Sequence, residues 1–274
     1  MKIANDAYYT PVDLANELWN KTIALIGAKN ITYVIEPSCG SGAFLQHPKY
    51  RANFAVDIAT ECYGMCDTFV QGDFLSMNFP YHKGLLVIGN PPFGSRMQLA
   101  QRFYKHSITF ADYIAFILPI SQLDNTQSLY EFDLIHSEDL GERDYSGRKL
   151  HCCFNVYSRP KQGLNPKPAV SHPLVRIYRD RCKGFEDCEY DVRMCYWGNG
   201  SAGKILSKGE HYSGEYKIKV LDESRKDEII NFIKSYPWMD KFHGVAMRKI
   251  QQFHIHKVLA DKFGERKEPN LFGL

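Results

Sequence analysis

The segment VIEPSCGSGAFL, residues 34–45, carries the clearest signal of the fold class. An apolar run ends in the acid Glu36, and Pro37 leads into a turn that contains Gly40 and Gly42. Glycine can adopt positive φ values and lets the backbone pass close to a ligand. The third glycine of the dinucleotide-binding fingerprint is absent, and Glu36 would repel a pyrophosphate. The segment therefore predicts a strand, a tight turn and a helix around a site for a cationic group, with a bare strand-to-helix turn as the alternative.

Apolar runs on both sides of this segment indicate the rest of the sheet. Each run is short and bounded by Gly, Pro, Asp or Asn, as expected for the buried strands of a mainly parallel sheet. The expected strands are 33–35, 54–56, 68–70, 85–88 and 114–118, and helices are expected over 11–28 and 97–110. The pattern predicts an α/β fold with a Rossmann-like, doubly wound sheet.

The character of the sequence changes after residue 158. Residues 159–173 are rich in Pro and Gly, which is typical of a linker or a long loop. Beyond them the expected elements are strands over 175–178, 190–196 and 216–220 and helices over 227–234 and 249–262. We therefore predict one domain over 1–160 and a small α+β region over 161–274.

The composition is that of an ordinary globular protein. The 274 residues are 44% hydrophobic and 24% charged, with a net charge of +3. No apolar run is long enough to cross a membrane, and the N-terminus lacks the apolar core of a signal peptide, so we expect a cytoplasmic protein. The eight cysteines form no Cys-x-x-Cys pair, so we expect reduced thiols and no metal site.

Two more acids stand at the ends of the next expected strands. Asp57 can accept hydrogen bonds from both ribose hydroxyls of a bound nucleoside. Asp73 can accept from an adenine amino group, while Phe74 packs on the ring. Taken singly, each Asp is a helix cap or a loop acid more often than a ligand. Together with Glu36, however, they mark three successive strand ends at the sheet edge where open α/β sheets bind ligands.

The segment GNPPFG, residues 89–94, directly follows the expected strand 85–88. Pro91 and Pro92 fix φ twice, so the backbone is rigid. The Asn90 side-chain carbonyl and the Pro91 carbonyl are two fixed acceptors, which can bind both hydrogens of a planar amino group. They would direct its lone pair toward an electrophile and stabilise positive charge on nitrogen. Phe93 offers a flat face for a base; a plain turn is the alternative.

The order of these motifs resembles that of the amino-methylating, adenine-specific DNA methyltransferases. The resemblance is to their gamma arrangement, in which the catalytic domain precedes target recognition. It covers roughly residues 1–160, and the segments that carry it are 8–11, 36–42, 57, 73–74 and 90–93.

The resemblance implies S-adenosyl-L-methionine as the cofactor. In that family the Tyr-Thr-Pro segment folds over the methionine end of the cofactor. The implied cofactor contacts are Tyr9, Thr10, Pro11, Glu36, Pro37, Gly40, Gly42, Asp57, Asp73 and Phe74. No metal is implied.

The resemblance also implies an activity, methyl transfer to the exocyclic amino group of an adenine flipped out of double-stranded DNA. Asn90, Pro91, Pro92 and Phe93 would form the catalytic loop. Phe154, in the expected strand 153–157, would place a second ring against the flipped base, with an ordinary core Phe as an equal alternative. A restriction endonuclease encoded in another chain is a candidate partner.

Three other functions stay open at this point. An RNA adenine methyltransferase could use the same Asn-Pro-Pro-Phe loop, although the Tyr-Tyr-Thr-Pro start and the extra C-terminal region favour DNA. A protein-glutamine methyltransferase also uses an Asn-Pro-Pro loop, but its family usually has Tyr where this chain has Phe93. The third alternative is an inactive DNA-binding module, against which the intact acids and Asn90 argue.

The C-terminal part is rich in basic residues. Arg248 and Lys249 are the residues for which we predict DNA contact, through phosphates rather than base edges. A solvated helix face is the alternative.

Overall fold

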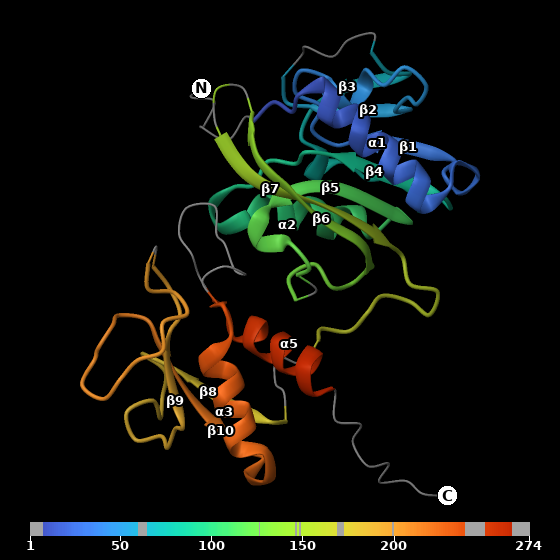
Figure 1. Ribbon diagram of the computed structural model, residues 1–274. Helices are drawn as coiled ribbons and strands as arrows, with labels where there is room; N and C mark the ends of the chain where they lie inside the picture. The colour runs from blue at the N-terminus through green and yellow to red at the C-terminus, as the bar shows by residue number, and fades with distance from the viewer. Residues whose placement is uncertain are drawn as a thin grey trace, which may run out of the picture. The chain divides into compact units, whose positions relative to one another are not determined.

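The computed structural model describes residues 8–59, 65–125, 127–145, 147, 149–168, 173–198, 200–238 and 250–264. The chain divides into two compact units, Met1–Pro168 and Ala169–Leu274 (Figure 1). The first unit extends past the predicted boundary at residue 160. Hydrogen bonds explain the difference, because Arg159 donates to two backbone carbonyls of this unit and Asn165 donates to Asp133. The start of the Pro- and Gly-rich segment is thus fastened to the first unit.

A seven-stranded sheet forms the centre of the first unit, in the order β3-β2-β1-β4-β5-β7-β6. Its strands are β1 (Tyr33–Glu36), β2 (Phe54–Asp57), β3 (Thr68–Gln71), β4 (Leu85–Gly89), β5 (Tyr113–Pro119), β6 (Asp133–Asp144) and β7 (Lys149–Ser158). Every pair from β3 to β5 is parallel, while β7 is antiparallel to both of its neighbours. The predicted mainly parallel α/β sheet is confirmed.

Two apolar layers, one on each face of the sheet, explain why its central strands are apolar throughout. In β4, Leu86 belongs to a core cluster with residues of α1 (Val12–Ile26), whereas Val87 belongs to a second cluster with residues of α2 (Gln98–Ser107). Successive side chains of a strand point to opposite faces. Both faces are therefore buried, as in doubly wound folds.

The chain after the glycine turn departs from the prediction. Instead of an α-helix it forms a short 3-10 turn, Ala43–Leu45. Pro48 disfavours helical backbone angles at the preceding residue, His47. His47 Nδ1 also accepts hydrogen bonds from the backbone N–H groups of Lys49 and Tyr50, which gives this backbone local partners outside a helix. The predicted helix at this place was wrong.

The edge strand β6 was not predicted, and its sequence explains why. The segment DLIHSEDLGERD contains no apolar run, and most of its residues are half-buried or exposed. Its register against β7 shifts between Leu134 and His136 and again between Asp139 and Gly141. Charged residues and bulges are common at sheet edges, where they discourage pairing with other chains.

The second unit combines a small sheet with helices. Its strands are β8 (Val175–Arg179), β9 (Val192–Cys195) and β10 (Glu215–Val220), antiparallel in the order β8-β10-β9. The helices α3 (Lys226–Ser235) and α5 (Gln252–Phe263) share one apolar core with these strands. These five elements confirm the strands and helices predicted for this region.

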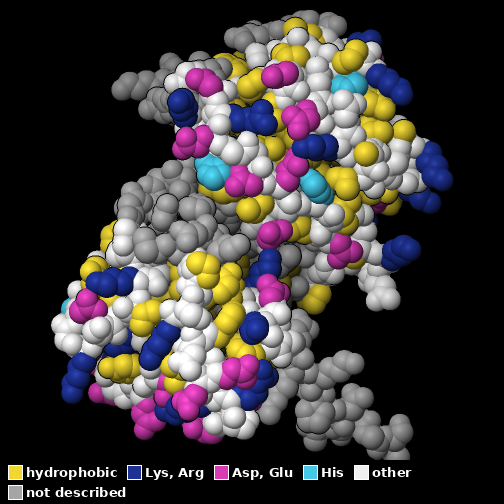
Figure 2. All heavy atoms as spheres, viewed as in Figure 1, with side chains coloured by type: hydrophobic (Ala, Val, Ile, Leu, Met, Phe, Trp, Pro, Cys, Tyr) yellow, Lys and Arg dark blue, Asp and Glu magenta, His cyan; other side chains and the backbone are white. Residues whose placement is uncertain are grey.

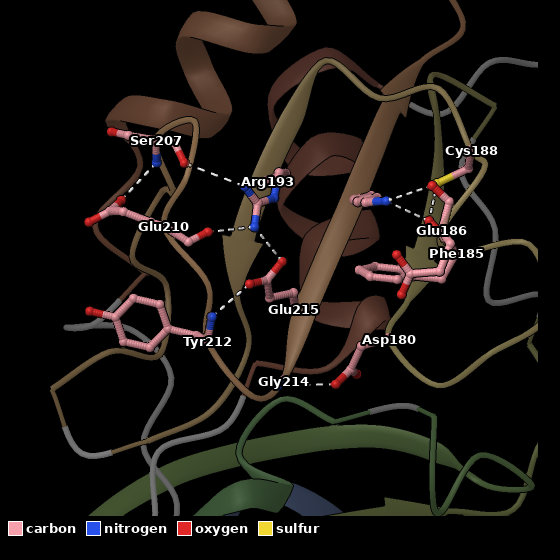
Figure 3. A network of polar contacts seen from close by, with 11 residues as sticks. Asp180, Phe185, Glu186, Cys188, Arg193, Ser207, Glu210, Tyr212, Gly214 and Glu215 are labelled. Atoms are coloured by element: carbon pink, nitrogen blue, oxygen red, sulfur yellow. Dashed lines mark hydrogen bonds and ion pairs between the residues drawn. The ribbon is translucent and has the colours of Figure 1, made fainter.

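A buried polar network ties the loops of the second unit to its sheet (Figure 3). The Arg193 guanidinium pairs with the Glu215 carboxylate at 2.7 Å and donates to the backbone carbonyls of Ser207 and Glu210. Lys217 Nζ donates to a backbone carbonyl of the loop that precedes β9. Buried ions are tolerated when they are paired and hydrogen-bonded in this way. The network therefore fixes two long loops against the strands.

Two kinds of feature are absent from the described part of the chain. No helix there is long and apolar enough to cross a membrane. No group of three or more His, Cys, Asp or Glu side chains among those residues is arranged to hold a metal ion. The seven cysteines that the structure describes are all free thiols.

Candidate active site

The candidate site lies at the carboxyl ends of β1, β2 and β4. β1 is the strand at which the order reverses, since the chain passes from β1 to β2 on one side and to β4 on the other. In open α/β sheets this switch point is where ligands bind. The three strand ends carry Glu36, Asp57 and the segment that begins with Asn90.

Glu36 is a buried acid whose carboxylate has few polar partners among the described residues. Its side chain is 1% exposed and accepts one hydrogen bond, from the Ser38 backbone N–H at 3.1 Å. No ion pair joins it to a cation among the described residues. Burial raises the pKa of the Glu36 carboxyl well above its usual range, and the nearby Asp57 charge adds to the shift. Such a group is matched to a cationic ligand, which would favour its charged form.

Gly89 makes room for this acid. A Cβ atom at Gly89 would overlap the Glu36 carboxylate, so only glycine fits at the end of β4. Gly89 was not among the predicted site residues. The sequence did contain a signal for this role, because a glycine inside a strand often marks a close approach of another group.

Asp57 organises the glycine turn. Its Oδ2 accepts from the Gly40 backbone N–H at 2.7 Å, and its Oδ1 accepts from the Ala59 backbone N–H at 2.8 Å. Gly40 and Gly42 have φ values of +51° and +80°, which glycine adopts at little cost. The Tyr9 ring lies against the turn, since a Cβ at Gly40 would meet it at 3.1 Å. The structure thus brings Tyr9, Gly40 and Asp57 together, as expected for one ligand site.

Asn90 is held by the N-terminal segment. Its Nδ2 donates to the Tyr8 backbone carbonyl at 3.2 Å and to Thr10 Oγ1 at 3.1 Å. The Tyr8 carbonyl can only accept a hydrogen bond, so the Asn90 side-chain atom that faces it must be the amide nitrogen. Asn90 Oδ1 is therefore left as an acceptor. Ser38, a partner that sequence analysis missed, donates from Oγ to the Asn90 backbone carbonyl at 3.3 Å.

The two prolines and Phe93 complete the loop. Pro91 is buried, Pro92 and Phe93 are half-buried, and the Pro91 carbonyl accepts no hydrogen bond from the described residues. The Phe93 ring stacks with the Tyr8 ring at 6.1 Å between centroids. The Phe93 carbonyl accepts from the first turn of α2, which anchors the end of the loop.

The backbone between this loop and α2 is strained. Arg96 and Met97 have φ values of +52° and +63°, which non-glycine residues rarely adopt. Strain of this kind tends to occur at functional sites, where the surrounding structure enforces it.

Asp73 and Phe74 follow the third parallel strand and differ in exposure. Asp73 Oδ1 accepts from the Leu75 backbone N–H, which makes Asp73 the cap of a 3-10 turn, although its side chain stays exposed. The Phe74 ring is 1% exposed and packs among Phe79 and Phe103. These contacts make Phe74 a core ring of the first unit, and its packing on an adenine ring stays a prediction.

Of the remaining predicted residues, the structure describes Pro37 and Pro11 but not the two C-terminal basic residues. Pro37 is buried beside Glu36, and Pro11 is half-buried at the N-terminal cap of α1. Arg248 and Lys249, the predicted DNA contacts, lie outside the described residues.

Phe154 on β7 is a core residue. Its ring is 0% exposed and belongs to the cluster that contains α1. This burial favours the core alternative, and the stacking of Phe154 on a target base stays a prediction.

We expect Phe154→Ala to lower the free energy of unfolding by about 3–5 kcal/mol, the usual cost of this truncation in a core. Phe154→Leu should keep most of the stability and near-normal activity. Denaturant titration together with an activity assay checks both variants. A stable Phe154→Leu protein with activity lost would instead indicate that the ring contacts the substrate.

Known structures overlap with part of this chain at low sequence identity. No protein-family model and no curated sequence matches the chain. The N-methyltransferase NodS from Bradyrhizobium japonicum, in complex with S-adenosylhomocysteine, is 14% identical, with a TM-score of 0.42 over 58% of this chain and 94% of its own. The 23S rRNA methyltransferase ErmE is 11% identical, with a TM-score of 0.41 over 58% and 72%. The [4+2]-cyclase SpnF is 9% identical, with a TM-score of 0.42 over 57% and 87%.

These overlaps cover little more than half of this chain. The seven-stranded, mainly parallel sheet is by its own strand order a doubly wound, Rossmann-like sheet. A fold does not determine a reaction, so the chemistry of this site rests on the residues of the chain itself.

Proposed function

We propose that the chain is an S-adenosylmethionine-dependent methyltransferase that acts on the exocyclic amino group of adenine in DNA. The hydrogen bonding of Asn90 carries this proposal. Tyr8 and Thr10 occupy its Nδ2, which leaves Oδ1 and the adjacent Pro91 carbonyl as acceptors. A planar amino group has two N–H bonds to donate, and two fixed acceptors match it. A hydroxyl could satisfy only one of them.

The residues around the glycine turn fit the cofactor. S-adenosylmethionine carries an ammonium group, and the buried Glu36 carboxylate has no other cation among its described contacts. Each Asp57 oxygen retains a lone pair after accepting from Gly40 or Ala59, which suffices for two ribose hydroxyls. When bound, this cofactor supplies a methyl group on a sulfonium. We place its ammonium at Glu36 and its ribose at Asp57.

The catalytic work of the chain is positioning. Asn90 Oδ1 and the Pro91 carbonyl hold both hydrogens of the target amine, so its lone pair points to the methyl donor. The same two dipoles stabilise the positive charge that grows on nitrogen. Ser38 belongs to the cofactor turn and bonds the Asn90 carbonyl. That bond holds the acceptor loop in a fixed position relative to the cofactor turn. The two loops therefore need to move little during methyl transfer.

The target base must leave the duplex to reach this loop. Phe93 offers the stacking face for it, and the Tyr8 ring that stacks there shows that a flat ring fits against Phe93. We propose that Tyr8 moves aside when the adenine enters. Because Tyr8 also holds Asn90 through its backbone carbonyl, its side chain can move while that hydrogen bond stays.

An acceptor panel tests the proposal. The purified chain is incubated with methyl-labelled S-adenosylmethionine and with three acceptors, which are adenine-unmethylated genomic DNA, total RNA and a glutamine-containing peptide. We expect label in DNA adenine. Transfer to RNA or to the peptide alone would overturn the choice of substrate. Calorimetry without detectable cofactor binding would overturn the whole proposal.

A further inference from the structure

One end of the sheet in the second unit holds a pocket. The last residues of β8 and β9 and the first residues of β10 meet there, because β10 is antiparallel to both neighbours. The pocket has a volume of about 210 Å³, and its lining residues are Arg179, Asp180, Arg181, Tyr196, Trp197 and Gly214. Pockets for drug-sized ligands are larger, roughly 300–1,000 Å³. This one suits a group as small as one nucleobase.

Trp197 forms a fixed, partly exposed wall of this pocket. Its side chain is 37% exposed, and its Nε1 donates to the Ser213 backbone carbonyl. The indole lies against Gly214, where a Cβ atom would overlap the ring. Gly214 has a φ of +96°, a value that favours glycine. Because the ring is held in place, stacking on it would cost little conformational entropy.

Two arginines supply the positive charge. The Arg179 guanidinium lies 5.0 Å from the Tyr196 ring centroid, and its Nε donates to Tyr196 Oη at 3.2 Å. The Nη groups of Arg179 and the whole guanidinium of Arg181 have no hydrogen bond or ion pair with other described residues. Arg181 also has a φ of +63°, which non-glycine residues rarely adopt. The pocket therefore presents donors that an anion could use.

The one acid in the pocket is already engaged. Asp180 accepts from Tyr196 Oη at 2.8 Å and from the Gly214 backbone N–H at 3.1 Å, the latter drawn in Figure 3. It thus positions the aromatic and glycine walls. On the face drawn in Figure 2, basic side chains of this unit stand among acidic ones, so that face carries no broad positive surface.

We propose that this pocket binds one unpaired nucleotide of the target strand, with its base on Trp197 and its phosphate between Arg179 and Arg181. The inference rests on the proposed function only in that the target is a nucleic acid. Every base has a π face that can stack on an aromatic ring, and guanidinium groups bind phosphate in a bidentate manner. An acidic peptide would use the arginines but not the indole. The combination of ring and cations therefore favours a nucleotide.

Tryptophan fluorescence of the full chain gives a direct test. Trp19 and Trp238 are 1% and 2% exposed, so Trp197 is the one of the three tryptophans on which a base from solution can stack. A short single-stranded DNA oligonucleotide should quench the fluorescence in a saturable manner. Trp197→Ala should weaken binding by about tenfold. The fluorescence anisotropy of a labelled oligonucleotide measures this affinity. Trp197→Phe should lose the quenching but keep most of the affinity.

The arginines are tested by salt dependence. Arg179→Ala and Arg181→Ala should each weaken binding and reduce the slope of log affinity against log salt by about 0.7, the value for one phosphate of a single strand. Arg176→Ala is the matched control, because Arg176 is exposed on the same strand and does not line the pocket. We expect it to leave both affinity and slope nearly unchanged.

The inference is overturned if the oligonucleotide causes no quenching, if Trp197→Ala binds normally, or if Arg176→Ala has the same effect as Arg179→Ala. Equal quenching by polyglutamate would also overturn it. Failure of the methyltransferase proposal gives a different result. In that case the wild-type chain would transfer no methyl group while the quenching persists.

Discussion

Replacing Asn90 with alanine is expected to lower the rate of methyl transfer by about a hundredfold or more while cofactor affinity stays nearly unchanged. The variant loses one of two fixed acceptors for the target amine, and the loss of one such group typically has an effect of this size. Tyr8 and Thr10 each lose one hydrogen bond from Asn90. Glu36 and Asp57, to which we assign the ammonium and ribose of the cofactor, keep theirs. Single-turnover transfer and calorimetry measure the two quantities separately.

Asn165→Ala is the matched control for this experiment. It removes the same side chain from the same unit, but Asn165 Nδ2 donates to Asp133 on β6 rather than to the N-terminal segment. We expect normal transfer in this variant. Near-normal turnover in Asn90→Ala would rule out the role assigned to the acceptor loop.

Replacing Glu36 with glutamine is expected to have opposite effects on stability and on binding. The carboxyl is buried, and burial raises its pKa well above the usual range. At neutral pH the ligand-free fold therefore has to hold either a proton or a buried charge, a cost that glutamine avoids. The variant should unfold at a higher temperature. It should also bind S-adenosylmethionine more weakly, by about 1.5–3 kcal/mol, because a charge-assisted hydrogen bond is lost.

The pH dependence distinguishes this explanation from a packing effect. The folded-state pKa of Glu36 lies above its unfolded-state value, so the unfolded chain releases this proton first as the pH rises. The stability advantage of Glu36→Gln should be absent below about pH 4 and should grow as the pH rises toward the folded-state pKa. Glu142→Gln, which replaces an exposed acid, should show no such trend. Equal melting temperatures of wild type and Glu36→Gln at every pH would contradict the account.

The sequence predicted the centre of the sheet well, because buried parallel strands carry a strong local signal. β4 and β5 are apolar on both faces, so their runs could be located without knowing their neighbours. β6 carries no such signal, since it is a polar edge strand whose pairing with β7 fixes it. The 3-10 turn after Gly42 depends on His47 side-chain bonds, which no periodicity reveals.

The candidate site could be predicted in its chemistry but not in its orientation. Motif spacing identified Glu36, Asp57 and Asn90, which the structure places at adjacent strand ends. It did not show which way the rings of Phe74 and Phe154 point, because that depends on the face of the sheet each residue occupies. Nor could it show that the N-terminal segment bonds the Asn90 amide, a contact between residues far apart in the chain.

Methylation of adenine in DNA, the activity that we propose for this chain, can be measured in living cells. The chain is expressed in a bacterial strain that lacks adenine methylation, and its genomic DNA is digested to nucleosides for mass spectrometry. We predict N6-methyldeoxyadenosine well above the level of the strain that carries Asn90→Ala. Equal, background levels of this nucleoside in the two strains, with both proteins folded and present in similar amounts, would contradict the claim.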